Sequence, residues 1–188
     1  PHPLEEIEAA LLRVAVNPPE SLLPQIMADR RGLLRAIHRS LPQDGDTELV
    51  LVLDQFEEVF TLVEDESERA LLLDALVEAV LAERSRVRVI VTLRADFIDK
   101  PLRYVDFAEL MQRRMELVLP LTPDEIERAI AGPASRVGLQ LEAGLVEAIT
   151  SDVIEQPGGL PLLQYALTEL YEQRQDRALT KNAYQAIG

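Results

Sequence analysis

The chain has 188 residues, enough for one large domain or for a core domain with a small additional one. Because 47% of the residues are hydrophobic and only 4% aromatic, the hydrophobic core must consist mainly of aliphatic side chains. The net charge of −14 is spread along the sequence without a basic stretch, which argues against nucleic-acid binding and electrostatic membrane attachment. The sequence has no cysteine and no apolar run long enough to span a bilayer, which favours a cytoplasmic location without disulfides.

Helices are predicted before the first strand. Apolar residues at helical spacing predict one helix over residues 4–15 and a second over residues 21–41. Residues 49–53 are five consecutive aliphatic residues, and Asp54 follows them. Because this run does not alternate with polar residues, we expect a strand that is buried on both faces, as in a parallel sheet covered by helices.

Two more strands are predicted further along the chain. A long helix is expected over residues 68–84, a buried strand over residues 87–93 and a short third strand over residues 116–119. A strand, a helix and a second strand in this order are typical of a βαβ unit, so the sheet is expected to be parallel and the fold class α/β.

The sequence changes character at Pro120. Thr122 and Glu125 are spaced as the two ends of a capping box. Only helices are predicted beyond it, over residues 123–137, 142–154 and 160–174 and from Lys181 onward. We therefore expect a partial α/β core over residues 1–119 and an all-helical subdomain over residues 120–188.

The first candidate functional residues follow the strand over residues 49–53. Asp54 lies at its carboxyl end, where open α/β sheets bind their ligands, and Glu57 and Glu58 come within the next turn. An aspartate in this place can hold Mg²⁺, and a later glutamate can orient an attacking water. Carboxylates are also favoured at any helix N-terminus, so the residues alone leave both interpretations open.

The second candidate group follows the strand over residues 87–93. Thr92 and Arg94 are expected at the same sheet edge as Asp54. The guanidinium of Arg94 can contact a terminal phosphate, because its geometry matches that of a phosphate group. Alternatively, Arg94 forms an ion pair with Asp54 or Asp96.

Other functions stay open at this stage. One is a metal-dependent phosphoesterase in which Asp54, Glu57, Glu58 and Asp96 form a two-metal cluster. Another is a non-catalytic scaffold whose helices bind partner proteins. A phosphate-binding loop of the form GxxxxGK[ST] is absent from residues 1–188, because neither lysine follows a glycine.

The chain resembles the nucleotide-binding domain of the novel STAND NTPases along essentially its whole length. The motifs that carry the resemblance occur in the order VLDQFEEVFTL, VTLRADF, LPLTPDEIERAIAGPASRVG, PGGLPLLQYALTELYE and LTKNAYQAIG. The resemblance implies a partial P-loop NTPase fold of the AAA+ and STAND type, with residues 120–188 as a helical lid. It also implies ATP or ADP and Mg²⁺ as cofactors of the intact protein.

Site residues follow from the same resemblance. Asp54 corresponds to the Walker B acid that holds Mg²⁺, Glu57 or Glu58 to the catalytic acid, and Arg94 to the sensor. Gly159 and Pro161 resemble a motif whose proline packs on the adenine ring.

The resemblance also implies that the chain is a fragment. The family's first strand, P-loop and second strand should precede the opening residues PHPLEEIEAALL. We therefore expect a bacterial signalling ATPase with effector domains and WD-repeats, of which residues 1–188 alone are inactive and bind nucleotide weakly or not at all. The expected partners are the missing P-loop segment and these further domains.

Self-association is the last expectation. In the family's sheet order, 5-1-4-3-2, the missing strand 1 lies between residues 87–93 and residues 116–119. Its absence would leave bare strand edges and apolar faces, so the chain is expected to self-associate, rearrange or close over the gap.

Overall fold

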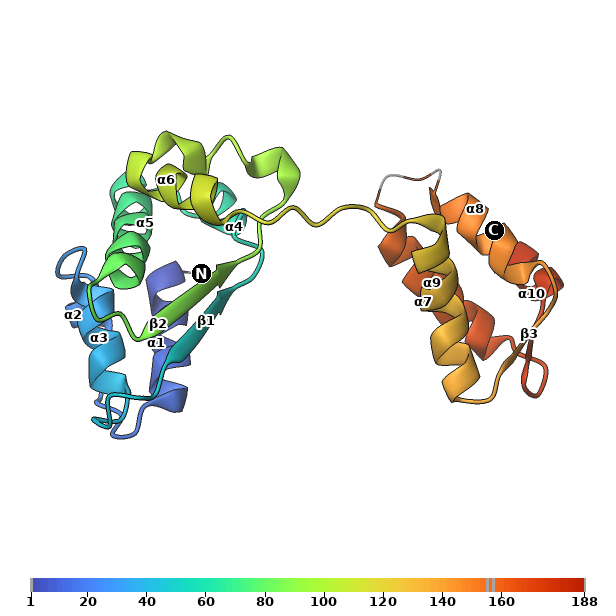
Figure 1. The fold of residues 1–188 in the computed structure, drawn as a ribbon, viewed down its shortest axis with the longest axis horizontal. Coiled ribbons are helices and arrows are strands. Elements are labelled where there is room, and N and C mark those ends of the chain that lie inside the picture. The colour runs from blue at the N-terminus through green and yellow to red at the C-terminus, as the bar shows by residue number, and fades with distance from the viewer. Residues whose placement is uncertain (1, 155, 157, 188) are drawn as a thin grey trace. The chain divides into compact units, whose positions relative to one another are not determined.

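The computed structural model describes residues 2–154, 156 and 158–187, which fold as two compact units, Pro1–Glu116 and Leu117–Gly188 (Figure 1). Each unit has its own hydrophobic core. The boundary that the sequence places after residue 119 falls in the stretch without helix or strand that opens the second unit.

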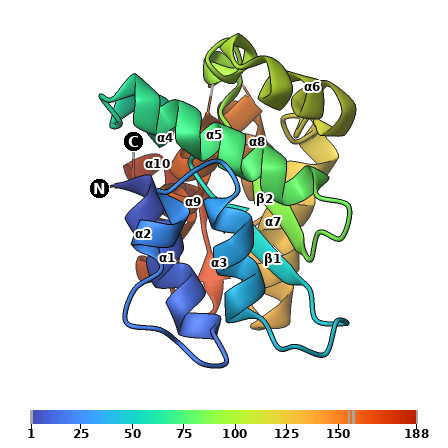
Figure 2. The same cartoon turned by 90° about the vertical axis from the view of Figure 1, so that its left-hand side faces the viewer.

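A parallel pair of strands lies at the centre of the first unit. β1 (Leu49–Leu53) and β2 (Val87–Val91) pair in register from their first to their last residue, which confirms the expected parallel sheet. The remaining elements are α1 (Pro3–Val14), α2 (Leu23–Ile26), α3 (Gly32–Ser40), α4 (Glu58–Thr61), α5 (Glu66–Leu81), the 3-10 helices η1 (Ala95–Phe97) and η2 (Pro101–Arg103), and α6 (Val105–Arg114). Figure 2 shows α1, α3 and α5 side by side in front of the strands.

The sheet is buried on one face only. Leu51 and Val87 pack in the core with side chains of α1, α3 and α5. On the opposite face Val50, Val52 and Ile90 are 56%, 57% and 52% exposed. The expectation that both faces are covered is therefore wrong, because in the described part of this unit the packed helices lie on the same side of the strands.

The helix predicted over residues 21–41 is divided into α2 and α3. The Asp29 carboxylate accepts a hydrogen bond from the backbone N–H of Arg31 at 2.8 Å, which favours a turn over a continuing helix. Gly32 then approaches the preceding helix so closely that a Cβ atom there would lie 2.2 Å from the carbonyl oxygen of Gln25. The apolar spacing predicted the helical faces but not this turn.

The strand predicted over residues 116–119 is not formed. The segment is neither helix nor strand, and the side chain of Val118 is 96% exposed. A strand needs a neighbour for its backbone hydrogen bonds, and within the described ranges no strand lies alongside this segment.

The second unit is mainly helical. Its elements are α7 (Pro123–Arg136), β3 (Gln140–Leu141), α8 (Leu145–Ile154), α9 (Gly159–Glu172), β4 (Ala178–Leu179) and α10 (Lys181–Ile187). The predicted capping box is present, since the carboxylate of Glu125 accepts from the N–H of Thr122 at 2.8 Å. The expectation of helices alone is wrong, because β3 and β4 pair in parallel. No helix in the described ranges is long and apolar enough to cross a membrane.

Glu8 joins α1 to the start of α2. Its Oε1 atom accepts hydrogen bonds from the hydroxyl of Ser21 at 2.6 Å and from the N–H groups of Leu22 and Leu23 at 2.5 and 2.8 Å. These hydrogen bonds, that of Ser21 above all, lower the pKa of the Glu8 carboxyl group below its ordinary value of 4.5.

We predict that Glu8→Gln lowers the free energy of unfolding by about 1 kcal/mol near pH 7, since the charge strengthens these hydrogen bonds. Because the pKa of Glu8 is lowered on folding, the carboxylate contributes to the free energy of unfolding above pH 4.5, and this contribution is lost as the pH falls below that value. Urea unfolding at about pH 7 and about pH 3 measures the difference. Glu5→Gln, at an exposed position of α1, is the control; an equal loss for Glu8→Gln at both pH values would contradict the prediction.

Candidate functional site

The carboxyl ends of β1 and β2 form one edge of the sheet, which we call the carboxyl edge (Asp54, Gln55, Thr92 and Arg94). The pairing continues past both strands, because the N–H of Thr92 donates to the carbonyl of Leu53 at 3.0 Å. The parallel register therefore brings Asp54 and Arg94 to the same edge, as the order of strands and helices predicts.

Thr92 connects the two strand ends. Its hydroxyl donates a hydrogen bond to Oδ1 of Asp54 and accepts one from the N–H of Gln55 at 3.0 Å. Gln55 has a positive φ of 53°, so the chain turns sharply directly after Asp54. The sequence places Thr92 at this edge but does not reveal the contact, because only the strand register decides which side chain lies opposite Asp54.

Arg94 has Asp96 as its ion-pair partner. Its Nε and Nη2 atoms donate to the two carboxylate oxygens of Asp96 at 3.0 and 2.8 Å. The hydrogen bonds from Arg94 lower the pKa of the Asp96 carboxyl group below its ordinary value. Both side chains are exposed, and exposed ion pairs are weak, so Arg94 is free to exchange this partner for another anion.

Glu57 and Glu58 lie in different surroundings. The carboxylate of Glu57 accepts a long hydrogen bond of 3.4 Å from the N–H of Arg94, so it is at the carboxyl edge. Glu58, the first residue of α4, is exposed and lines a cavity of about 260 Å³ between α1, β1, α4 and α5.

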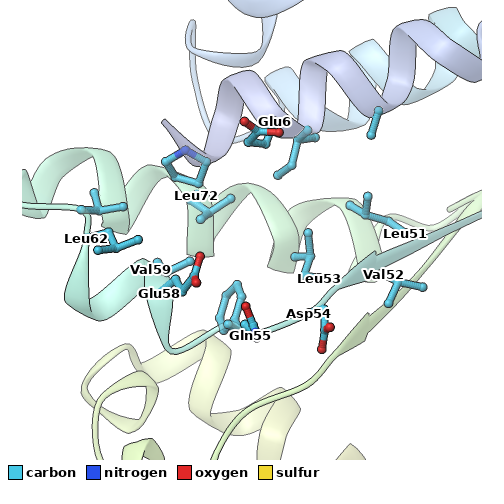
Figure 3. A pocket seen from close by; sticks show the side chains of 15 residues that line it. Glu6, Leu51, Val52, Leu53, Asp54, Gln55, Glu58, Val59, Leu62 and Leu72 are labelled. Carbon is cyan, nitrogen blue, oxygen red and sulfur yellow. The ribbon is translucent and has the colours of Figure 1, made fainter. Parts of the chain in front are cut away.

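Most of this cavity has apolar walls. Figure 3 shows Leu51 and Leu53 pointing from β1 toward the helices, whereas Asp54 points to the other side of the strand. The carboxylate therefore faces the side of the sheet that carries the exposed Val50 and Val52, and a ligand of Asp54 is expected there and not in the apolar part of the cavity.

The geometry of Asp54 suits a Mg²⁺ ion that is shared with phosphates. Its side chain is exposed, and Thr92 engages Oδ1, while Oδ2 makes no hydrogen bond to the part of the chain that the structure describes. Mg²⁺ is typically held by one or two carboxylates together with substrate phosphates and water.

The residues that the structure describes do not form a two-metal cluster. Across the described ranges, no three acidic or histidine side chains gather as metal ligands. Asp96 instead pairs with Arg94, and Glu58 lines the cavity on the helical side of β1, whereas the carboxylate of Asp54 points to the other side. The four carboxylates of the phosphoesterase hypothesis are therefore not assembled by the described residues.

Gly159 and Pro161 begin α9 in the second unit. The preceding Gly158 has a positive φ of 72°, which a glycine adopts without strain. Gly159 is buried, and a Cβ atom on it would lie 2.6 Å from the carbonyl oxygen of Val153, so the close approach of α8 and α9 requires glycine. Pro161 is exposed in the first turn, while Pro157 of the same motif lies outside the described residues.

Polar side chains gathered at the carboxyl edge of parallel strands are typical of ligand-binding α/β proteins. The family model described as Novel STAND NTPase 1 matches residues 1–188, and the chain therefore belongs to this family of STAND NTPases. Comparison with curated proteins and with solved structures gave no match.

We predict that Thr92→Val lowers the free energy of unfolding of the first unit by about 1–2 kcal/mol, because Asp54 and the N–H of Gln55 both lose a hydrogen-bond partner. Thr92→Ser keeps the hydroxyl and is expected to retain most of the stability. Urea unfolding of both variants measures the difference. Equal stability of the valine and serine variants would show that the hydroxyl does not join the strand ends.

Proposed function

We propose that this chain is the Walker B and sensor portion of a nucleotide-dependent signalling switch with a P-loop NTPase fold. The observation that supports it is the exposed carboxylate of Asp54 at the end of β1, fixed by Thr92 and next to Arg94, in a member of the STAND NTPase family. When bound, Mg²⁺ would neutralise charge on the phosphates of ATP or ADP.

Each residue of the carboxyl edge has a separate role in this proposal. Asp54 would hold Mg²⁺, and Arg94 would exchange Asp96 for a terminal phosphate. Glu57 is better placed than Glu58 to orient an attacking water, because the carboxylate of Glu57 accepts a hydrogen bond from the N–H of Arg94 at the carboxyl edge.

The phosphate-binding loop has to come from outside residues 1–188, because these contain no GxxxxGK[ST] motif. A segment ahead of residue 1 that pairs with the free edge of β2 would bring such a loop to the carboxyl edge. The second unit then acts as the lid, with Gly159 and Pro161 contacting the adenine, and effector and repeat domains of the same protein respond to the ADP or ATP state.

Nucleotide binding tests the proposal. Titration calorimetry of residues 1–188 should show no saturable binding of ATP or ADP up to about 1 mM, because no loop surrounds the phosphates. A longer form of the protein that carries GxxxxGK[ST] within about 60 residues ahead of residue 1 should bind ATP and hydrolyse it.

In that longer form, Asp54→Ala should abolish the Mg²⁺ dependence of binding, whereas Glu64→Ala, at an exposed position beyond α4, should not change it. A low micromolar Kd for residues 1–188 alone would contradict the proposal.

The bare face of β1 and β2 further suggests that the isolated chain associates with itself. Val50, Val52 and Ile90 form an exposed apolar face, and such faces mark interaction surfaces. Sedimentation velocity should therefore show dimers or larger species up to about 0.1 mM chain. The double variant Val52→Lys with Ile90→Lys should be monomeric, while Val105→Lys, at a 71% exposed position of α6, should associate as before. A monomeric parent chain would rule this association out.

A further inference from the structure

The largely buried side chain of Arg69 on α5 contacts the short helix α4. Its side chain is only 15% exposed. Nε donates to the carbonyl of Val59 at 3.1 Å, Nη2 donates to the carbonyl of Val63, and Nη1 pairs with the carboxylate of Glu66. One guanidinium therefore binds a carbonyl within α4 and another beyond its end.

Helix α4 depends on such outside contacts. It has four residues, and a single helical turn has too few internal hydrogen bonds to be stable alone. The carbonyl groups at a helix end lack partners within the helix, and Arg69 supplies donors for them. Because Glu57 is the N-cap residue of α4, the position of its carboxylate follows that of the helix.

Glu66 extends the contact to the segment that carries Arg94. The hydroxyl of Tyr104 donates to Oε1 of Glu66 at 2.6 Å, and Tyr104 ends the stretch of chain that begins at Arg94 and precedes α6. The ring of Tyr104 also lies near that of Phe60 in α4, with 6.4 Å between the centroids. Tyr104 is therefore connected to α4 in two ways, through Glu66 and Arg69 and by its ring contact with Phe60.

We infer that Arg69 is a positioning residue, which fixes Glu57 relative to Arg94 through Glu66 and Tyr104. The hydrogen bond between Glu57 and Arg94 is long, at 3.4 Å. The shorter one from the N–H of Phe56 to the carbonyl of Thr92, at 2.9 Å, joins the two segments ahead of both residues. The roles of Glu57 and Arg94 in this inference rest on the proposed function, whereas the coupling of the two segments depends only on the fold.

Arg86 provides a matched control at the other end of the strands. Its side chain is 18% exposed, and it too binds two carbonyls and one carboxylate. Nε donates to Thr47 at 2.9 Å, Nη1 to Pro42 at 3.0 Å, and Nη2 to Asp44 at 3.1 Å. Arg69→Met and Arg86→Met therefore remove the same kind of contacts at opposite ends of β1 and β2.

Amide hydrogen exchange of residues 1–188 tests the inference. Arg69→Met should speed exchange about tenfold or more in residues 58–62 and also in residues 97–104, which Arg69 contacts through Glu66 and Tyr104. Arg86→Met should leave both segments within about twofold of the parent chain. Arg69→Lys, with one ammonium in place of the guanidinium fork, should restore only part of the protection.

Tyr104→Phe removes the hydrogen bond from Tyr104 to Glu66 and should speed exchange in residues 97–104 more than in residues 58–62. If Arg69→Met does not fold, Tyr104→Phe, which lacks only one hydroxyl group, and Arg69→Lys test the inference instead. Unchanged exchange in residues 97–104, or equal effects of the Arg69 and Arg86 variants, would overturn the inference. Absence of ATP binding by the longer form would instead overturn the proposed function and leave the exchange result valid.

Discussion

The parallel pairing of β1 and β2 is the constraint on which the rest of the first unit depends. With Leu53 opposite Val91, both strands end at the same edge, and the next residues of each chain segment meet there. Thr92 donates hydrogen bonds to the carbonyl of Leu53 and the carboxylate of Asp54, and its hydroxyl accepts one from the N–H of Gln55. These hydrogen bonds fix where the carboxylate of Asp54 points. An antiparallel pair would place Asp54 and Arg94 at opposite ends.

Because only one face of the sheet is buried, the carboxyl edge has a solvent-exposed carboxylate. Since Leu51 and Leu53 point to the helices, alternation along β1 places Asp54 on the bare face. The carboxylate is therefore accessible to solvent, and Thr92 engages only its Oδ1 atom among the contacts of the described residues. Asp54 borders the apolar cavity on the helical side, but its carboxylate points to the other side of the strand.

The sequence predicts β1, β2 and their parallel pairing, because long aliphatic runs followed by polar residues are strong local signals, and its motifs predict the family. It misses β3 and β4, whose two-residue strands are too short to give such a signal. It does not predict contacts that depend on register or on distant partners. The turn at Asp29 includes a side-chain hydrogen bond to the N–H of Arg31 and the close approach of Gly32 to the preceding helix, and a strand over residues 116–119 would need a neighbouring strand. The contacts of Arg69 arise only when α5 packs against α4.

Backbone nuclear Overhauser contacts in isotope-labelled residues 1–188 test the central claim most directly, namely that parallel pairing assembles the carboxyl edge. The account predicts contacts between Leu51 and Val89, and between Gln55 and Thr92, in the observed register. Antiparallel contacts, or a register shifted so that Thr92 no longer lies beside Asp54, would contradict it.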